Sequence, residues 1–228
     1  RLTSTKSTVE LYGPYPDGAE KTKSPVVNPA ARRPNVVIIY CDDLGYGDLG
    51  CYGSRAIDTP SIDRLAEEGV LFTDFHACNA ICAPSRAGLL TGRYPFRTGI
   101  IGNTYPKNEP LKRVMARNFG QMLGSLGVLD IRERYIARGI ADAEITLAEA
   151  LKSGGYRTCM VGKWHLGDYS NDPHYNPINH GFDHYLGVPY SNDMIPFPLY
   201  RNETELSPDL GQDRDQAQLT GLYTREAV

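Results

Sequence analysis

The longest clearly apolar run of this chain is Val36-Val37-Ile38-Ile39-Tyr40-Cys41, and it leads directly into Asp42-Asp43-Leu44-Gly45-Tyr46-Gly47. An unbroken β-branched run of this kind is typical of a strand covered on both faces of a sheet. Two carboxylates and two glycines after it indicate a loop. In open α/β sheets, ligands bind beyond the carboxyl ends of the strands. The sequence therefore predicts a central strand at 36–41 that is followed by a candidate ligand-binding loop.

The next segment predicts a helix and a second strand. Thr59 followed by Pro60 has the pattern of an N-cap with proline at the first helical position. Gly69 is expected to end this helix. The apolar residues at 70–75 then predict a strand.

A second alternation follows further along the chain. Thr146 and Glu149 have capping-box spacing at the start of a helix over 146–152, and Gly154-Gly155 is expected to end it. Residues 156–161 predict a strand, and a further helical pattern starts near Gln216. Strands that alternate with helices in this way predict an α/β fold with a mostly parallel central sheet flanked by helices.

Two stretches depart from this alternation. Residues 1–34 are rich in proline and show no sustained apolar period, so they predict an extended N-terminal arm. Residues 103–140 combine basic residues with apolar stretches that glycine interrupts, and they are interpreted as an insertion. We favour a solvated surface excursion over a binding element for this insertion.

Composition excludes several classes of protein. Lys plus Arg number 24 and Asp plus Glu number 27, so a net charge of -3 gives no general basic field for nucleic acid or anionic lipid. The longest apolar run is too short for a transmembrane segment. The 5 cysteines form no CxxC pair, which argues against a disulfide scaffold or a zinc ribbon. A glycosylation triplet at Asn202 would lie on a surface loop if the chain were secreted by a eukaryote.

The most informative motif is Cys82-Ala83-Pro84-Ser85-Arg86, with Leu90-Thr91-Gly92-Arg93 shortly after it. Pro84 suits a first helical turn, which places Cys82 at or just before a helix N-terminus, where free N–H groups favour negative charge. Arg86, one turn later, can place its planar guanidinium against a sulfate or phosphate. On residue chemistry alone, a reactive or anion-binding Cys82 and a buried structural cysteine both remain open.

Two further groups indicate chemistry. Asp42 and Asp43 would repel each other unless a cation neutralised them, and oxygen ligands favour a hard ion such as Ca²⁺ or Mg²⁺. An Asx turn would explain one of these residues more easily than both. Lys163 and His165 follow a predicted strand, where flanking glycines allow the chain to turn. Taken alone, His165 is more typical of a hydrogen-bonded structural histidine than of a catalyst.

Together these blocks resemble the sulfatase family. The pattern Cys-x-Pro-Ser-Arg followed by Leu-Thr-Gly-Arg, which is the signature of that family, stands intact at 82–93. The blocks at 34–50 and 154–167 resemble its first strand with the metal loop and its second signature. The block at 180–193 resembles the segment that follows in arylsulfatases and galactosamine-type sulfatases. The resemblance identifies 35–228 as the N-terminal part of a sulfatase catalytic domain, with the C-terminal part missing.

This resemblance implies a sulfuric ester hydrolase of the alkaline phosphatase superfamily. Its substrate would be an aryl or carbohydrate sulfate ester, from a sulfated small molecule or a glycan. In the family, a maturation enzyme reads the motif around Cys82 and oxidises this cysteine to formylglycine. Asp42, Asp43 and residue 82 would then hold Ca²⁺, with Mg²⁺ as the alternative ion.

The resemblance also assigns roles in catalysis. Arg86 and Lys163 would neutralise the sulfuryl oxygens in the transition state, and Lys163 would also bind the substrate. His165 would help to deprotonate a hydroxyl of the hydrated aldehyde, so that sulfate leaves. Ser191 resembles a position that lines the pocket, although a turn serine is an equal alternative.

Two other functions remain open at this point. The first is a phosphate or phosphonate ester hydrolase of the same superfamily, and the second is a catalytically silent homologue that acts as a binding protein. Family members usually work in lysosomes, in the periplasm or outside the cell. A secreted, periplasmic or lysosomal location is therefore expected.

Overall fold

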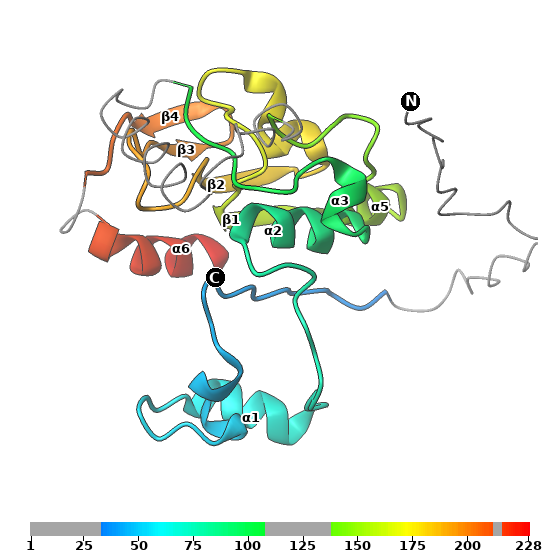
Figure 1. The fold of residues 1–228 in the computed structure, drawn as a ribbon, viewed down its shortest axis with the longest axis vertical. Coiled ribbons are helices and arrows are strands. Elements are labelled where there is room, and N and C mark those ends of the chain that lie inside the picture. The colour runs from blue at the N-terminus through cyan, green and yellow to red at the C-terminus, as the bar shows by residue number, and fades with distance from the viewer. Residues whose placement is uncertain (1–32, 108–137, 212–215) are drawn as a thin grey trace, which may run out of the picture. The chain divides into compact units, whose positions relative to one another are not determined.

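A four-stranded sheet in the order β1-β2-β3-β4 forms the centre of the fold (Figure 1). The computed structural model describes residues 33–107, 138–211 and 216–228, and the chain divides into the units Arg1–Cys41 and Asp42–Val228. The strands are β1 (Cys159–Lys163), β2 (His184–Val188), β3 (Leu199–Arg201) and β4 (Thr204–Ser207). The predicted α/β class is confirmed. Strands β1 and β2 are parallel, whereas β2 with β3 and β3 with β4 are antiparallel, so the described sheet is not mostly parallel as predicted.

The helices of the described part include five α-helices and several short 3₁₀ turns. The α-helices are α1 (Pro60–Glu68), α2 (Cys82–Thr91), α3 (Pro95–Thr98), α5 (Leu147–Ser153) and α6 (Leu219–Ala227). The 3₁₀ turns are Tyr46–Asp48, Gly50–Tyr52, Pro173–Tyr175, Pro177–His180 and Gln216–Gln218. No helix in the described ranges is long and apolar enough to cross a membrane.

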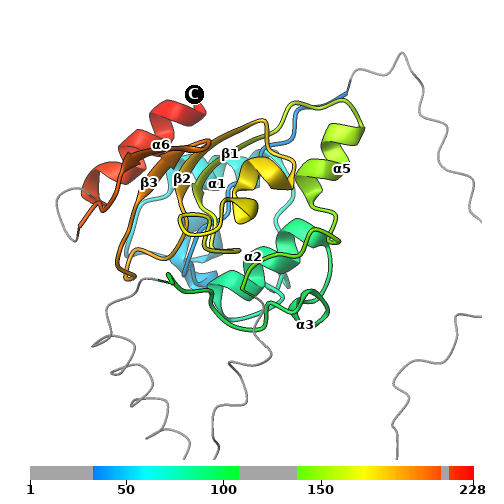
Figure 2. The same ribbon diagram turned by 90° about the horizontal axis from the view of Figure 1, so that it is seen from above.

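Side chains that alternate along β2 divide the core into two layers. Tyr185 belongs to a buried cluster with Ala83 of α2 and Ala148 of α5. Leu186 belongs to a second cluster, against which Leu222 of α6 packs. Because successive side chains of a strand point to opposite faces, these clusters lie on the two sides of the sheet. Figure 2 shows α6 on one side of the sheet and α2 with α5 on the other.

The helix boundaries follow the sequence signals. Thr59 is the N-cap of α1 with Pro60 at the first position, and Gly69 is its C-cap. The predicted start of the helix near residue 216 is also confirmed, since a 3₁₀ turn at Gln216–Gln218 leads into α6. The strand predicted at 156–161 is present but lies later, at Cys159–Lys163.

Two predicted strands are absent from the structure. Residues 36–41 and 70–75 form neither helix nor strand. Val37 and Val70 are exposed by 81% and 76%, respectively. A strand needs a neighbour for its backbone hydrogen bonds, and no strand in the described ranges pairs with either segment. The apolar pattern predicts a β conformation but cannot supply the partner strand.

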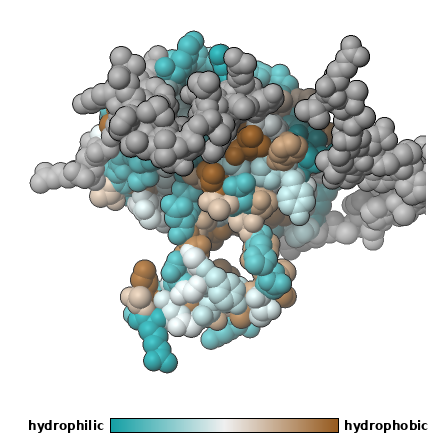
Figure 3. Space-filling view, viewed as in Figure 1, coloured by the Kyte–Doolittle hydropathy of each residue, from teal (hydrophilic) through white to brown (hydrophobic). Residues whose placement is uncertain are grey.

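The segment around α1 also leaves apolar side chains in solvent. Ile57, Leu65 and Phe72 are exposed by 65%, 60% and 61%. Figure 3 shows apolar and polar side chains side by side on the surface of this part of the chain. Helix α1 therefore forms as its sequence pattern predicts, although its apolar side chains stay largely exposed.

Both ends of the stretch 103–140 contribute buried residues to the fold, whereas Tyr105, Lys107 and Arg138 are exposed. Thr104 is 4% exposed and Ile140 is fully buried. The N–H of Ile140 donates to the carbonyl of Leu166 at 2.9 Å, and Gly139 forms a β-bridge with Gly167. Hydrophobic and hydrogen-bonding partners far away in the sequence decide this position. Residues 108–137, and residues 1–32 of the predicted arm, lie outside the described residues.

The glycosylation triplet lies in the tight turn between β3 and β4. Asn202 adopts a left-handed backbone conformation with φ 53°. Its side-chain oxygen accepts from the N–H of Tyr185 at 2.8 Å, so this side chain fastens the turn to β2.

We predict that the capping box of α5 stabilises the fold. The Thr146 hydroxyl accepts from the N–H of Glu149 at 3.1 Å and donates to the carbonyl of His180 at 2.8 Å. Thr146→Ala should therefore lower the free energy of unfolding by about 1–2 kcal/mol. Urea unfolding measures this change. Thr224→Ala, at an exposed position of α6, is the control and should cost less than about 0.5 kcal/mol. Equal losses in the two variants would contradict the prediction.

Candidate active site

The candidate site lies where the parallel strands β1 and β2 end. Lys163 is the last residue of β1, and the chain beyond it stays beside the end of β2. The N–H of Trp164 donates to the carbonyl of Val188 at 3.0 Å, and the N–H of His165 donates to that of Pro189 at 3.0 Å. Ser191 follows two residues later. The carboxyl edge of this strand pair therefore positions the lysine, the histidine and the serine, as expected for an α/β sheet.

Helix α2 supplies the next two residues of the site. It begins at Cys82, with Pro84 in its first turn, which confirms the predicted helix N-terminus. Arg86 follows one turn later, and its side chain is only 11% exposed. Both residues thus lie in the first turns of one short helix, where the helix dipole favours negative charge.

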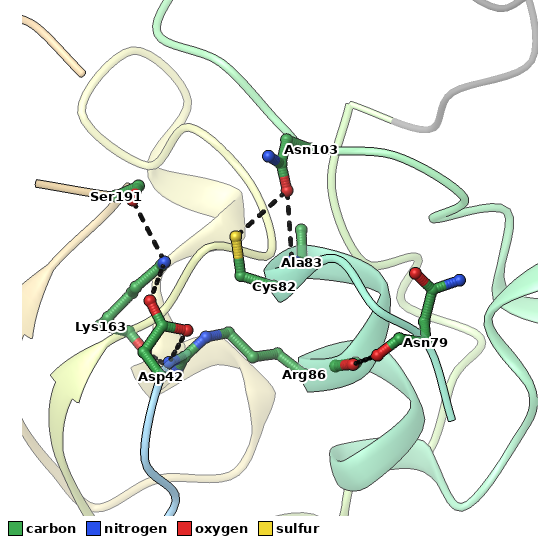
Figure 4. Close-up of polar contacts among 9 residues, drawn as sticks. Asp42, Asn79, Cys82, Ala83, Arg86, Asn103, Lys163 and Ser191 are labelled. Atoms are coloured by element: carbon green, nitrogen blue, oxygen red, sulfur yellow. Dashed lines mark hydrogen bonds and ion pairs between the residues drawn. The ribbon is translucent and has the colours of Figure 1, made fainter. Parts of the chain in front are cut away.

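Asp42 joins the helix and the strand end through two ion pairs (Figure 4). Its Oδ1 accepts from Nη2 of Arg86 at 3.1 Å, and its Oδ2 accepts from Nζ of Lys163 at 2.6 Å. Nη1 of Arg86 donates to the backbone carbonyl of Lys163 at 2.6 Å. Nζ of Lys163 also donates to Oγ of Ser191 at 3.3 Å. Four of the predicted site residues therefore form one connected network.

The charges of this network explain the state of Asp42. Burial by itself would raise the pKa of Asp42, but the hydrogen bond and charge of Lys163, followed by those of Arg86, hold this pKa below its usual value. Asp42 is therefore ionised at neutral pH. With two cations and one carboxylate, the network keeps a net positive charge for an incoming anion.

His165 is held in an unusual conformation and is fully buried. Its φ of 60° is left-handed, which costs a non-glycine residue about 1–2 kcal/mol. Nε2 lies 3.0 Å from the carbonyl oxygen of Thr104. Because a carbonyl only accepts hydrogen bonds, Nε2 carries the proton, and Nδ1 is left as an unprotonated nitrogen. Within the described residues, Nδ1 is buried without a hydrogen-bond partner.

Burial also fixes the charge of His165. Removal from water, followed by the positive charge of Lys163, lowers the pKa of His165 to about 3. The ring is therefore neutral at physiological pH. A buried neutral imidazole with a free Nδ1 can accept a proton.

A buried carboxylate supports the segment that carries Ser191. Asp168 accepts hydrogen bonds from the N–H of Lys107 at 2.8 Å, from Nδ2 of Asn171 at 2.8 Å and from the hydroxyl of Tyr190. Tyr190 is fully buried and directly precedes Ser191. These bonds tie the chain beyond β2 to the turn beyond β1.

The described residues supply only part of the donors that a metal ion needs. The carboxylates of Asp42 and Asp43 fit a hard ion such as Ca²⁺ or Mg²⁺. Asp43 is exposed, with φ 55°, whereas both oxygens of Asp42 bind cationic side chains. No group of three His, Cys, Asp or Glu residues that could hold a metal occurs in the described part of the chain. Asp42 and Asp43 could therefore supply ligands on one side of a metal site.

Two residues near this network were not predicted from the sequence. Asn103 contacts Cys82 at the start of α2, and Thr104 contacts His165. Both stand at the edge of the stretch 103–140. No motif or period marks them, because they meet their partners only through the fold.

Comparisons with known proteins agree on one family. The sequence model of the family described as Sulfatase matches residues 34–219. The chain is 36% identical over 214 residues to the N-acetylgalactosamine-6-sulfatase of Sus scrofa, covering 89% of this chain and 37% of that protein. It is 44% identical over 161 residues to arylsulfatase H of Homo sapiens, covering 69% of this chain and 25% of that protein.

A solved structure gives the same result. It is described under the metabolism of multiple glycosaminoglycans by Bacteroides thetaiotaomicron, and it aligns with a TM-score of 0.58 and 35% identity. The alignment covers 77% of this chain and 32% of that one. This chain thus spans well under half the length of each of these relatives. Since the family's sequence model matches most of the residues and includes Asp42, Cys82 and Lys163, the chain belongs to the sulfatase family.

Proposed function

We propose that this chain carries part of the active site of a sulfuric ester hydrolase, which releases sulfate from an aryl or carbohydrate sulfate ester. The observation that supports this proposal is the cluster of Arg86 and Lys163 around Asp42, next to the helix that begins at Cys82. Two fixed cations and a helix N-terminus favour an oxyanion. The names of the relatives, an N-acetylgalactosamine-6-sulfatase and an arylsulfatase, support the two substrate classes.

Arg86 and Lys163 would bind and orient the sulfuryl group. Arg86 is held in place by the carbonyl of Lys163, so its guanidinium needs little reorganisation when an anion binds. Ser191 lies within hydrogen-bond distance of the Lys163 ammonium and would orient it toward the substrate. As negative charge builds up on the sulfuryl oxygens, the two cations would neutralise it.

His165 would act as the proton acceptor. Its Nε2–H is held by Thr104, which leaves Nδ1 as the only nitrogen that can take a proton. The positive charge of Lys163 contributes to the low pKa of His165. A bound sulfuryl anion would offset this charge and make Nδ1 more basic.

Residue 82 and the paired aspartates would supply the nucleophile. Formylglycine made from Cys82 would provide, when hydrated, the hydroxyl that attacks sulfur, while the S–O bond to the alcohol breaks and the alcohol leaves with that hydroxyl's proton. Transfer of the second hydroxyl's proton to His165 would then break the C–O bond to sulfate and restore the aldehyde. Asp42, Asp43 and residue 82 would hold Ca²⁺ or Mg²⁺. The positive charge of the bound ion would lower the free-energy cost of ionising the attacking hydroxyl. In this assignment both aspartates are metal ligands, and Asp42 also forms the ion pairs with Arg86 and Lys163.

The proposal includes a maturation enzyme and a location. Pro84 is fully buried and Arg86 is 9% exposed. An enzyme that reads the motif around Cys82 would therefore have to act before α2 packs into the core. Family membership supports a secreted, periplasmic or lysosomal location, which fractionation of the native cells would test.

Mass spectrometry of the peptide 65–86 tests the proposal directly. Full-length protein made in a host with a maturation enzyme should show formylglycine at position 82, and it should release sulfate from aryl or carbohydrate sulfate esters. A phosphate ester that reacts faster than the matching sulfate ester would favour the phosphatase alternative. An unmodified Cys82, in cells that convert another sulfatase, would favour a catalytically silent binding protein.

Lys163→Ala should abolish most of the activity without unfolding the protein. Loss of its ammonium removes one of two cations from the transition state, and kcat/KM for a sulfate ester should fall by about 100- to 1000-fold. Lys152→Ala is a matched control, because Lys152 also binds a carboxylate, that of Asp183, at 2.7 Å. Its side chain is 49% exposed, so activity should stay within about 2-fold of the parent. Equal losses in the two variants would contradict the assigned role.

The buried neutral histidine predicts a pH dependence of stability. The pKa of His165 is about 3 in the folded chain and 6.5 in its ordinary state. Between these values the unfolded chain binds a proton that the folded chain does not, so stability should fall as the pH falls below 6.5. His165→Asn should reduce this slope by up to about 1.4 kcal/mol per pH unit. Urea unfolding from pH 4.5 to 6 measures it, and an unchanged slope would refute the prediction.

A further inference from the structure

Asn103 makes two contacts at the start of α2 (Figure 4). Its Oδ1 accepts from Sγ of Cys82 at 3.4 Å and from the backbone N–H of Ala83 at 3.4 Å. A backbone N–H can only donate, and a thiol is a better donor than acceptor. The oxygen of the amide, and not its NH₂ group, therefore faces residue 82.

This contact replaces a missing helix cap. The N-cap residue of α2, Ile81, has no side chain that could accept from the first turn. The first N–H groups of a helix lack partners within the helix, so another group must bind them. Asn103, twenty residues away from Ala83 in the sequence, takes this role and touches the side chain of residue 82 at the same time.

The next residue holds the candidate proton acceptor. The Thr104 carbonyl accepts from Nε2 of His165 at 3.0 Å, and the Thr104 hydroxyl donates to the carbonyl of His165 at 3.3 Å. Thr104 and His165 are both buried. One dipeptide thus binds residue 82 on α2 and His165 beyond β1, although neither of these two elements is its neighbour in the sequence.

We propose that Asn103 is a positioning residue for residue 82, and that the Asn103-Thr104 pair sets the placement of residue 82 relative to His165. The hydroxyl that residue 82 would carry after conversion can donate to Oδ1 of Asn103 as the thiol does. This bond selects one orientation of the side chain. The expected effect on kcat rests on the proposed function, whereas the contact between Asn103 and residue 82 does not.

Two variants of Asn103 separate the hydrogen bond from the shape of the side chain. Asn103→Leu keeps the shape and loses the acceptor, whereas Asn103→Asp keeps an acceptor oxygen at the same place. In full-length converted protein, Asn103→Leu should lower kcat by about 10- to 100-fold with little change in KM, because misplaced reacting groups lose rate and not binding. Asn103→Asp should restore at least part of kcat. Each rate is divided by the fraction of formylglycine found by mass spectrometry.

A second measurement needs no enzyme activity. In unconverted full-length protein, the bond to Asn103 holds the Cys82 thiol in one orientation. Iodoacetamide should therefore alkylate Cys82 about 2- to 10-fold faster in Asn103→Leu, the factor expected for one lost hydrogen bond. The rate should not rise in Asn103→Asp. The exposed cysteines Cys41, Cys78 and Cys159 are internal controls in the same digest.

Asn79→Leu is the matched control variant. The Oδ1 of Asn79 accepts from the N–H of Ile81 at 2.9 Å, so this change removes an amide cap just before α2 without touching residue 82. It should alter neither kcat nor the alkylation of Cys82. If Asn103→Leu does not fold, Asn103→Ala takes its place with the same expected results.

The possible outcomes distinguish the inference from the proposed function. If the parent protein releases no sulfate, the proposed function fails, and the alkylation rates still test Asn103. If the parent is active and Asn103→Leu matches it in both kcat and alkylation, the inference fails while the function stands. Equal effects of Asn79→Leu and Asn103→Leu would also overturn the inference, because they would reduce Asn103 to a general helix cap.

Discussion

The ionised carboxylate of Asp42 is the constraint on which the candidate site depends. It lies between Arg86 of α2 and Lys163 of β1, so it joins a helix to the end of a strand. Without a negative charge between them, the two cations would repel each other in a half-buried place. Their mutual position is therefore tied to Asp42. The same two cations remain available to an incoming oxyanion, because their combined charge exceeds that of the single carboxylate.

The sheet explains why these groups meet at one place. Parallel pairing of β1 with β2 brings the chain beyond Lys163 next to the chain that carries Ser191. Helix α2 packs its small residues Ala83 and Ala87 into the core on one side of this sheet. Small side chains allow a close approach, so Cys82 and Arg86 are brought to the strand ends. The candidate site residues of α2 therefore lie where this helix packs tightly against the sheet.

The charge state of the site also follows from burial. His165 is neutral because water is excluded from it and because Lys163 lies nearby. Asp42 stays charged because its cationic partners outweigh the effect of burial. A neutral base beside a positively charged anion site is the arrangement that hydrolysis of a sulfate ester would need. Within this one cluster, ion pairs keep Asp42 charged, whereas burial keeps His165 neutral.

By itself, the sequence determined the α/β class, the start of α2 at Cys82 and the capping box of α5, and it predicted the charged residues of the candidate site. These features depend on local signals, such as proline in a first turn or a threonine three residues before a glutamate. The strands predicted at 36–41 and 70–75 failed because an apolar run does not reveal whether a partner strand is present.

Only the tertiary structure decided the roles of Asn103, Thr104 and Asp168. Asn103 reaches residue 82 across 21 positions, and Thr104 reaches His165 across 61. Likewise, the burial of Thr104 and Ile140, at the two ends of the stretch 103–140, became apparent only in the structure. A hydrogen bond between residues so far apart leaves no period or motif in the sequence. It exists because packing brings the two groups together, and the sequence names only the groups.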